Sequence, residues 1–386
     1  GNGNDVLFNQ GKLESGWGIV FNGGDTGEGD YIYNYEDAII STYAGINFTG
    51  SGRGTIDNQG TINVALENTS GRQIIFGEGD DRILNRAGGV IDVNGVIKMG
   101  EGNDLVINNG TLTVTKGIDM GDGDDWFALS GEGLELNGSK VDGGDGFDNL
   151  VFSDQEISNT APFGVDVSQQ PSSGRIDIKA DDVAKRYENF EAAIQYKGSY
   201  EYQGDFSDLF EKVSVRDGVM VVRDADPVVF DNLELEPEGT IVVGLSNSDP
   251  GTGNTRVAPI TVTSKARLGG FIYDGGKLVI SADKQDDPQG TYFVIAGNVV
   301  NADALAANTS LVYDCDLETN TDCTSEEFIL IDDGLTLVNS MISDVNKIVS
   351  KKEYEQDMSN VDLESLPEDQ KNILADVSSS MKNKKI

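Results

Sequence analysis

Aspartate recurs at intervals along the first 150 residues, each time behind a pair of glycines. The pattern Gly-x-Gly-x-Asp-x-apolar includes Gly77–Ile83, Gly100–Val106 and Gly121–Phe127. Carboxylates and turn carbonyls are the oxygen ligands that Ca²⁺ prefers, so these corners predict a calcium site. The acids that would hold the ion are Asp81, Asp104, Asp122, Asp125, Asp145 and Asp148. Alternatively, each aspartate caps its own turn by accepting backbone N–H bonds and otherwise faces water, and no cofactor is required.

Other chemistry is restricted by composition. The absence of histidine excludes a Ser-His-Asp or Cys-His catalytic site, and a His-ligated zinc, within these 386 residues. The 66 acidic and 28 basic residues give a net charge of −38, which repels nucleic acid and anionic lipid. Cys315 and Cys323 predict a small disulfide loop formed in an oxidising compartment, with a reactive thiol pair as the alternative. The sequence contains no run of about 18 apolar residues, so it does not predict a membrane-spanning helix.

The spacing of the motif predicts the fold. Its copies end at residues 5, 30, 55, 81, 104, 125 and 148, which is 21 to 26 residues apart. Repeats-in-toxin modules carry a similar motif about every nine residues, so one copy here marks one coil of a larger solenoid. Gly1 already lies inside a copy, so the chain is expected to begin within the repeating structure.

Each coil also carries a second and a third turn. Asparagine recurs in the second, at Asn9, Asn34, Asn58, Asn85 and Asn108, where it can form a side-chain ladder along the axis. Short alternating strands lie between the turns. We therefore predict an all-β fold: a right-handed single-stranded parallel β-helix with three strands per coil.

The remaining chain divides by composition. Residues 1–152 are expected to form the regular coils, 153–186 a loop or excursion, and 187–335 a continuation of the helix with a β-rich cap. In the third part, Lys212–Arg216 and Val219–Val222 are predicted as strands separated by an Asp-Gly turn. Residues 336–386 have apolar residues at helical spacing and predict a short helical tail.

Residues 141–204 and 287–331 resemble the passengers of bacterial autotransporters. The resemblance rests on Val141–Phe152, Tyr187–Glu191, Gly198–Gly204, Gly290–Ala296 and Ser310–Asp314, although Tyr200 stands where many members have tryptophan. It implies type V secretion through the periplasm to the bacterial cell surface, with the protein's own outer-membrane translocator barrel as a partner. It also implies an autochaperone region near residues 200–335. The core residues assigned to that region are Phe190, Tyr200, Tyr202, Phe271, Tyr292 and Phe293.

The function expected from these features is a non-catalytic surface stalk, part of an adhesin or a self-associating protein. Its partners would be a host surface or like molecules on neighbouring cells. Two alternatives stay open: a calcium-binding repeats-in-toxin-like module, and the stalk of a passenger whose protease, lipase or polysaccharide-active domain is not in this chain. A polysaccharide lyase or epimerase would need a base among converging acids, and the few basic residues of the repeats show no such constellation.

Overall fold

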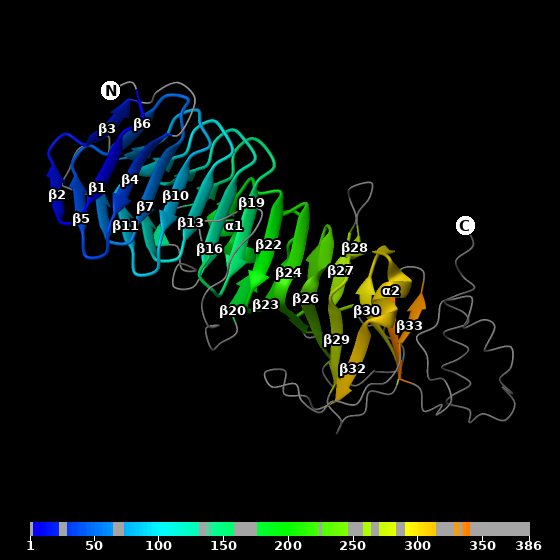
Figure 1. Ribbon diagram of the computed structural model, residues 1–386. Helices are drawn as coiled ribbons and strands as arrows, with labels where there is room; N and C mark the ends of the chain where they lie inside the picture. Colours follow the sequence, from blue (N-terminus) through cyan, green and yellow to red (C-terminus); the bar gives the residue numbers. More distant parts are fainter. Residues whose placement is uncertain are drawn as a thin grey trace, which may run out of the picture. The chain divides into compact units, whose positions relative to one another are not determined.

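The protein is all-β, with parallel sheets stacked as a β-solenoid of about nine turns (Figure 1). The computed structural model describes residues 3–22, 29–64, 73–130, 137–138, 140–157, 176–223, 226–245, 258–263, 270–282, 290–313, 328–331 and 334–339. The predicted all-β class and parallel stacking are confirmed. The hand of the coil and the number of strands in each turn stay predictions.

The chain forms two compact units. The first comprises Gly1–Arg175 and Asp181–Gly198, and the second comprises Ile176–Ala180 and Ser199–Ile386. The short helix α1 (Ala180–Arg186) begins at the end of the small segment assigned to the second unit.

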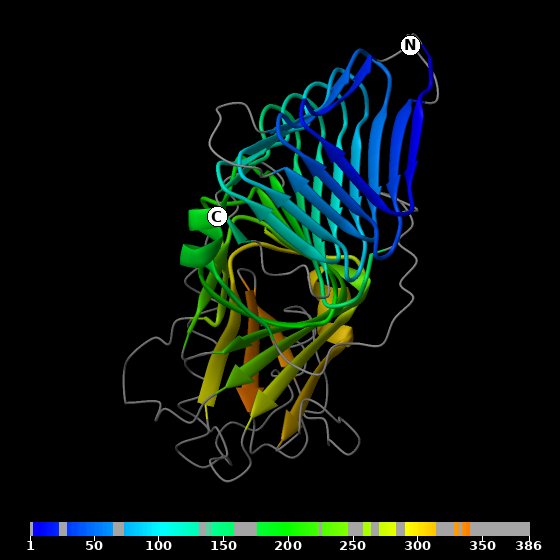
Figure 2. The ribbon, with the colours of Figure 1, turned by 90° about the vertical axis from the view of Figure 1, so that its left-hand side faces the viewer.

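Three stacks of parallel strands build the first unit, and strands three apart in chain order pair with each other (Figure 2). The first sheet contains β1 (Val6–Asn9), β4 (Asp30–Asn34), β7 (Gly54–Asn58), β10 (Arg82–Asn85), β13 (Leu105–Asn108), β16 (Trp126–Ser130), β19 (Asn149–Ser153) and β22 (Ala192–Lys197). The second contains β2 (Lys12–Ser15), β5 (Ile39–Thr42), β8 (Thr61–Val64), β11 (Val90–Val93), β14 (Thr111–Val114) and β17 (Asn137–Gly138). The third contains β3 (Ile19–Asn22), β6 (Ile46–Thr49), β9 (Gln73–Ile75), β12 (Val96–Lys98), β15 (Gly117–Asp119), β18 (Val141–Asp142) and β21 (Tyr187–Glu188).

Equivalent side chains stack inside the first unit. In the first sheet Ile32, Ile56 and Ile83 occupy one register column and are fully buried. Near the third sheet, the rings of Phe48 and Phe76 stack with centroids 4.7 Å apart and planes 1° apart. Because successive side chains of a strand point to opposite faces, every second residue points inward, and these inward residues stack from turn to turn as a continuous core.

The outward face of the first sheet is apolar as well in its later turns. Leu84, Ile107 and Val151 follow one outward register column and are nevertheless buried. Ile157 packs on them, and its amide N–H and carbonyl oxygen both bond to the Asn109 side chain at 2.9 Å. Residues 153–186 were predicted as a loop or excursion, and the described start of that segment, through Ile157, covers the outward face of the sheet.

Longer strands build the second unit. The main parallel stack contains β20 (Ile176–Lys179), β23 (Ser199–Asp205), β24 (Lys212–Arg223), β26 (Leu233–Leu245), β29 (Lys277–Ala282) and β32 (Thr309–Tyr313). Further pairs involve β25 (Val228–Phe230), β27 (Ile260–Val262), β28 (Phe271–Tyr273), β30 (Gly290–Ala296) and β31 (Val299–Val300), and the helix α2 (Ala302–Ala307) follows β31. Contrary to prediction, Asp217 and Gly218 do not end a strand. They follow a register shift within β24, where Gly218 has a φ of 79°, and pairing with β26 continues beyond them.

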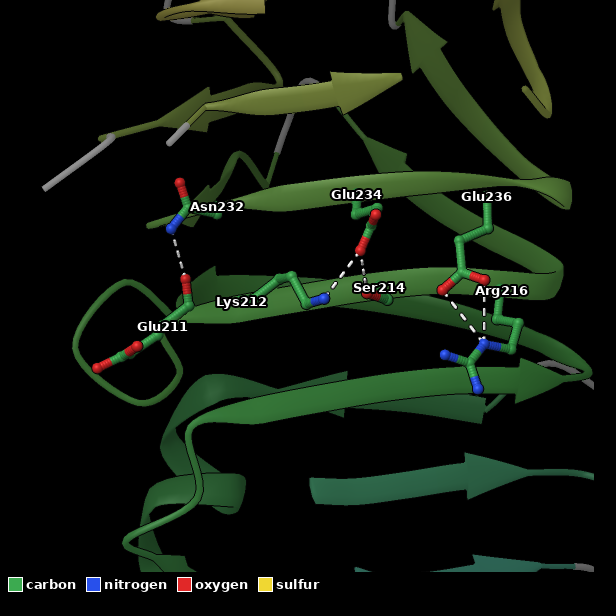
Figure 3. A network of polar contacts seen from close by, with 7 residues as sticks. All are labelled: Glu211, Lys212, Ser214, Arg216, Asn232, Glu234 and Glu236. Atoms are coloured by element: carbon green, nitrogen blue, oxygen red, sulfur yellow. Dashed lines mark hydrogen bonds and ion pairs between the residues drawn. The ribbon is translucent and has the colours of Figure 1, made fainter. Parts of the chain in front are cut away.

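Ion pairs join the first halves of β24 and β26 (Figure 3). Lys212 Nζ lies 2.9 Å from Glu234 Oε2, and Arg216 Nε lies 3.0 Å from Glu236 Oε2. Although burial alone would raise the pKa of Glu234, its contacts with Lys212 and Ser214 hold that pKa below its ordinary value. These contacts tie one turn to the next at partly exposed positions, so they favour the strand register.

The last described strand runs antiparallel to both of its neighbours. β34 (Gly334–Asn339) pairs antiparallel with β30 and with β33 (Phe328–Ile331). The predicted tail helix therefore does not begin at residue 336, because the alternating and β-branched run Leu335–Val338 pairs as a strand. The rest of the predicted tail lies outside the described residues, as do Cys315 and Cys323.

Candidate functional site

The corner aspartates form a buried column in the first unit. Asp104 Oδ1 accepts the backbone N–H of Asp81, one turn earlier, at 2.7 Å. The same bond joins Asp125 to the N–H of Asp104 at 2.7 Å, and Asp148 to the N–H of Asp125 at 2.8 Å. Each aspartate thus holds the preceding turn. This differs from the capping alternative in two ways, because Oδ1 of each carboxylate caps the neighbouring turn and the side chains are buried instead of facing water.

Glycine makes this close stacking of corners feasible. Gly121 has a φ of 107°, and a Cβ atom at its position would lie 1.8 Å from the carbonyl oxygen of Gly100. Its backbone conformation also strains any other residue. The glycines of the motif are therefore required by the approach of successive backbones.

One copy of the motif was aligned incorrectly in the sequence. The structure pairs Asp30 with Gly54, and Thr55 with Arg82, so Gly54 occupies the aspartate position in its turn. The Gly54 N–H is bonded by Asp81 Oδ1 at 2.5 Å. The strand register, which the sequence alone does not contain, places this corner one residue earlier than the motif does, at residue 54 instead of 55.

The second carboxylate oxygen is the chemically unusual feature of the column. Oδ2 of Asp104, Asp125 and Asp148 is buried and has no hydrogen-bond partner among the described atoms, whereas Oδ2 of Asp81 accepts the Gly77 N–H at 3.2 Å. Burial, reinforced by neighbouring carboxylates, raises the pKa of Asp104 to about 9. Burial likewise raises the pKa of Asp81 and Asp125 to about 7 and that of Asp148 to about 6. Desolvation disfavours the charged carboxylate, so these shifts favour the protonated form of Asp104 at neutral pH, whereas Asp148 is mostly ionised there.

The six acids predicted to bind calcium separate into two kinds. Asp81, Asp104, Asp125 and Asp148 form the buried column. Asp122 and Asp145 pair through their backbones on adjacent turns, and both side chains are exposed. Among the residues that the structure describes, no three acidic, histidine or cysteine side chains converge as a metal site. Calcium binding therefore stays a prediction, for which the unpaired Oδ2 atoms would be the available ligands.

The predicted asparagine ladder is confirmed. Asn34 Nδ2 donates to Asn58 Oδ1, and Asn58 Nδ2 to Asn85 Oδ1, each at 2.8 Å. Asn9 and Asn108 continue the ladder at its two ends with the same distance. The amides of Asn9, Asn34, Asn58 and Asn85 also donate to backbone carbonyls, as Asn58 does to Gly60 at 3.0 Å. All five side chains are buried, so the ladder satisfies polar groups that would otherwise be costly.

The residues assigned to the autochaperone core belong to both units. Tyr200, Tyr202 and Phe271 are fully buried in the second unit, and Phe190 is buried in the first. Tyr292 and Phe293 lie in β30, but their side chains are outside the described residues. In the second unit the Tyr202 ring contacts Phe206, at a centroid distance of 5.5 Å, and Phe230, at 6.1 Å. An aromatic cluster thus fills this unit's core.

A groove opens at the turns that follow β4, β7 and β10. It has a volume of about 760 Å³, and its lining includes Glu36, Asp37, Gln59, Arg86 and Glu156. The Arg86 guanidinium binds the buried Asp57 carboxylate through two bonds of 2.9 and 2.8 Å. The sequence does not indicate this pair, because Asp57 lies 29 residues before Arg86, on an earlier turn. The bonds to Asp57 raise the pKa of Arg86, which excludes this arginine as a base.

Comparisons with known proteins identify no relative of this chain, so its sites are interpreted from their own chemistry. No family model matches the chain, and neither the curated proteins nor the solved structures contain a significant match. Within the described residues, no helix has the length and apolar character needed to cross a membrane.

Proposed function

We propose that the chain is a non-catalytic surface stalk, secreted as part of an autotransporter passenger with an adhesive or self-associating role. The observation that carries the proposal is the continuous parallel solenoid, in which each turn supplies the pairing edge for the next. Such a structure can propagate from one end and can extend a distal region without a catalytic site. The barrel partner and the surface location follow from the resemblance to passengers.

The second unit is proposed as the folding-promoting cap. It has long strands, an aromatic core around Tyr202 and an antiparallel strand, β34, at its end. An exposed parallel edge could pair with a further strand, and the antiparallel strand β34 occupies such an edge. A unit with these features can fold first and then present an edge on which further turns assemble.

Refolding of the full chain tests this proposal, because both tryptophans, Trp17 and Trp126, belong to the first unit. Trp126 packs against the outward apolar cluster, so its fluorescence reports on the folding of the first unit. We expect Phe271→Ala, in the second unit, to slow recovery of this signal after dilution from denaturant. Phe127→Ala, an equally buried residue of the first unit, is the matched control and should mainly accelerate unfolding. The proposed folding role of the second unit would be contradicted if Phe271→Ala destabilises that unit but the tryptophan signal recovers at the parent rate.

A further inference from the structure

Aromatic side chains gather on the outward face of β4, beside the groove at the turns. The ring centroids of Tyr31 and Tyr33 are 6.2 Å apart with planes at 14°, and those of Tyr33 and Tyr35 are 4.5 Å apart. Phe8, on the neighbouring strand, is 64% exposed and lies 6.3 Å from Tyr33. In later turns the column of Tyr33 is aliphatic and covered, at Leu84 and Ile107, whereas here the rings are partly open to solvent.

Hydrogen bonds fix the polar edges of these rings. Gln59 Nε2 donates to the Tyr33 hydroxyl oxygen at 2.6 Å, and the Tyr31 hydroxyl donates to Asp57 Oδ2 at 3.2 Å. Asp57 is in turn held by Arg86. A bound ligand would therefore meet rings whose orientation is already set, which lowers the entropic cost of binding.

The aromatic side chains and the groove meet at Gln59 and at the turn after β4. Gln59 both bonds Tyr33 and lines the groove, and Tyr35 immediately precedes the groove residues Glu36 and Asp37. The volume of about 760 Å³ lies within the range of about 300–1,000 Å³ that is typical of ligand sites. The lining supplies carboxylate acceptors together with amide and guanidinium donors, from three successive turns.

We propose that this groove binds neutral oligosaccharides, with sugar rings lying against Tyr33 and Tyr35. A pyranose has an apolar C–H face that packs on an aromatic ring, and a rim of hydroxyls that both donate and accept hydrogen bonds. Gln59 and the acids Glu36, Asp37 and Glu156 match that rim. The net charge of −38 and the three acids disfavour sulfated or uronic-acid chains. A groove for a basic peptide would need only hydrogen-bond acceptors. Arg86 and Gln59 add donors to this lining, which favours a ligand that both donates and accepts.

This inference rests on the proposed function, since it names the ligand class for the adhesive role. Its test uses the full chain and titrations with cellotetraose, maltotetraose and tetra-N-acetylchitotetraose, followed by calorimetry. We expect at least one of them to bind with a Kd of about 1 mM or tighter. Absence of binding by all three at ~10 mM would overturn the inference. So would binding of octalysine, reversed by salt, in place of any oligosaccharide.

Variants locate the site. Tyr33→Ala and Tyr35→Ala should each weaken binding about fivefold to tenfold, the range expected for one lost aromatic contact. Tyr43→Ala is the matched control, because Tyr43 is exposed in the same coil but in the turn after β5. Circular dichroism of each variant checks that the fold is retained. Equal weakening in Tyr43→Ala would overturn the assignment to this groove. Absence of oligosaccharide binding would reject the glycan site alone, because the tryptophan refolding experiment tests the folding role of the second unit independently.

Discussion

Replacing Asp104 by asparagine tests whether the buried corner carboxylates carry protons in the folded protein. Asp104 is 1% exposed, and burial together with the nearby Asp81 and Asp125 carboxylates raises its pKa from 3.8 to about 9. At pH 8 the unfolded chain ionises this group while the folded chain keeps it protonated. At ~1.4 kcal/mol per pKa unit, that difference costs the native state on the order of 6 kcal/mol.

Asparagine removes this cost and keeps the oxygen that accepts the Asp81 N–H. Its amide group takes the place of Oδ2, which has no partner among the described atoms, so burial of that amide costs about 1–3 kcal/mol. We therefore expect Asp104→Asn to stabilise the protein by on the order of 3 kcal/mol at pH 8. At pH 4 both side chains are neutral in the folded state, and the variant should be equal to or slightly less stable than the parent.

The parent protein's stability should depend on pH with a defined sign. All four column aspartates have a folded pKa above the unfolded value, so folding takes up protons. Their contribution is fully present below about pH 4 and is lost as the pH rises through the folded values of about 6, 7 and 9. Guanidinium denaturation midpoints, followed by Trp126 fluorescence from pH 4 to pH 9, measure this loss.

Asp122→Asn is the matched control, because it removes an exposed acid at the equivalent corner of the next coil. Asp122 makes only a minor contribution to the raised pKa of Asp125, so this change should alter the pH slope little. The reasoning would be refuted by a stability that is flat or rises from pH 5 to pH 8, combined with a destabilising Asp104→Asn at pH 8. That pair of results means that the folded column is ionised. A bound cation is one way to ionise it, so stability that then falls in chelator would support the calcium prediction.

Three further changes test the rest of the corner architecture. Asn58→Ala should destabilise by about 2–4 kcal/mol, because it breaks ladder bonds to Asn34 and Asn85, whereas Asn63→Ala on the partly exposed side of β8 should have little effect in the same denaturation assay. Gly121→Ala should destabilise by more than about 2 kcal/mol, since its Cβ would overlap the Gly100 carbonyl, while Gly11→Ala meets nothing within 4 Å and serves as the control. Addition of a chelator should leave the far-UV circular dichroism unchanged if protonated aspartates hold the corners; loss of the β signal would contradict this.

The sequence predicted the features that repeat and missed those that depend on register. The corner glycines and the asparagine column recur at similar intervals, so their stacking follows from the period alone. The coil length nevertheless varies: the ladder bond from Asn58 spans 27 residues and that from Asn85 spans 23. For this reason Gly54 was misaligned, and the Arg86 partner, Asp57, was not recognised.

Strand length was misjudged for a local reason. Asp217-Gly218 has the composition of a turn, but pairing with β26 on both sides keeps the chain extended through an irregular register. Similarly, the sequence shows apolar residues such as Leu84 and Ile107 on the outward face of their strands, but it does not indicate which segment covers them. The cover, Ile157, is fixed by bonds to a single side chain, Asn109.

The two corner columns respond differently to pH because of the side chains that build them. An asparagine amide carries both a donor and an acceptor, so each rung satisfies the next at any pH. An aspartate column has acceptors only, unless protons supply the missing donors, and its rungs use backbone N–H groups for one oxygen. The second oxygen must then carry a proton, meet a cation or remain desolvated. The aspartate corners are therefore where acidity or a cation can act on the stack, and Asp104, with the highest pKa of the column, is the position that tests this most sharply.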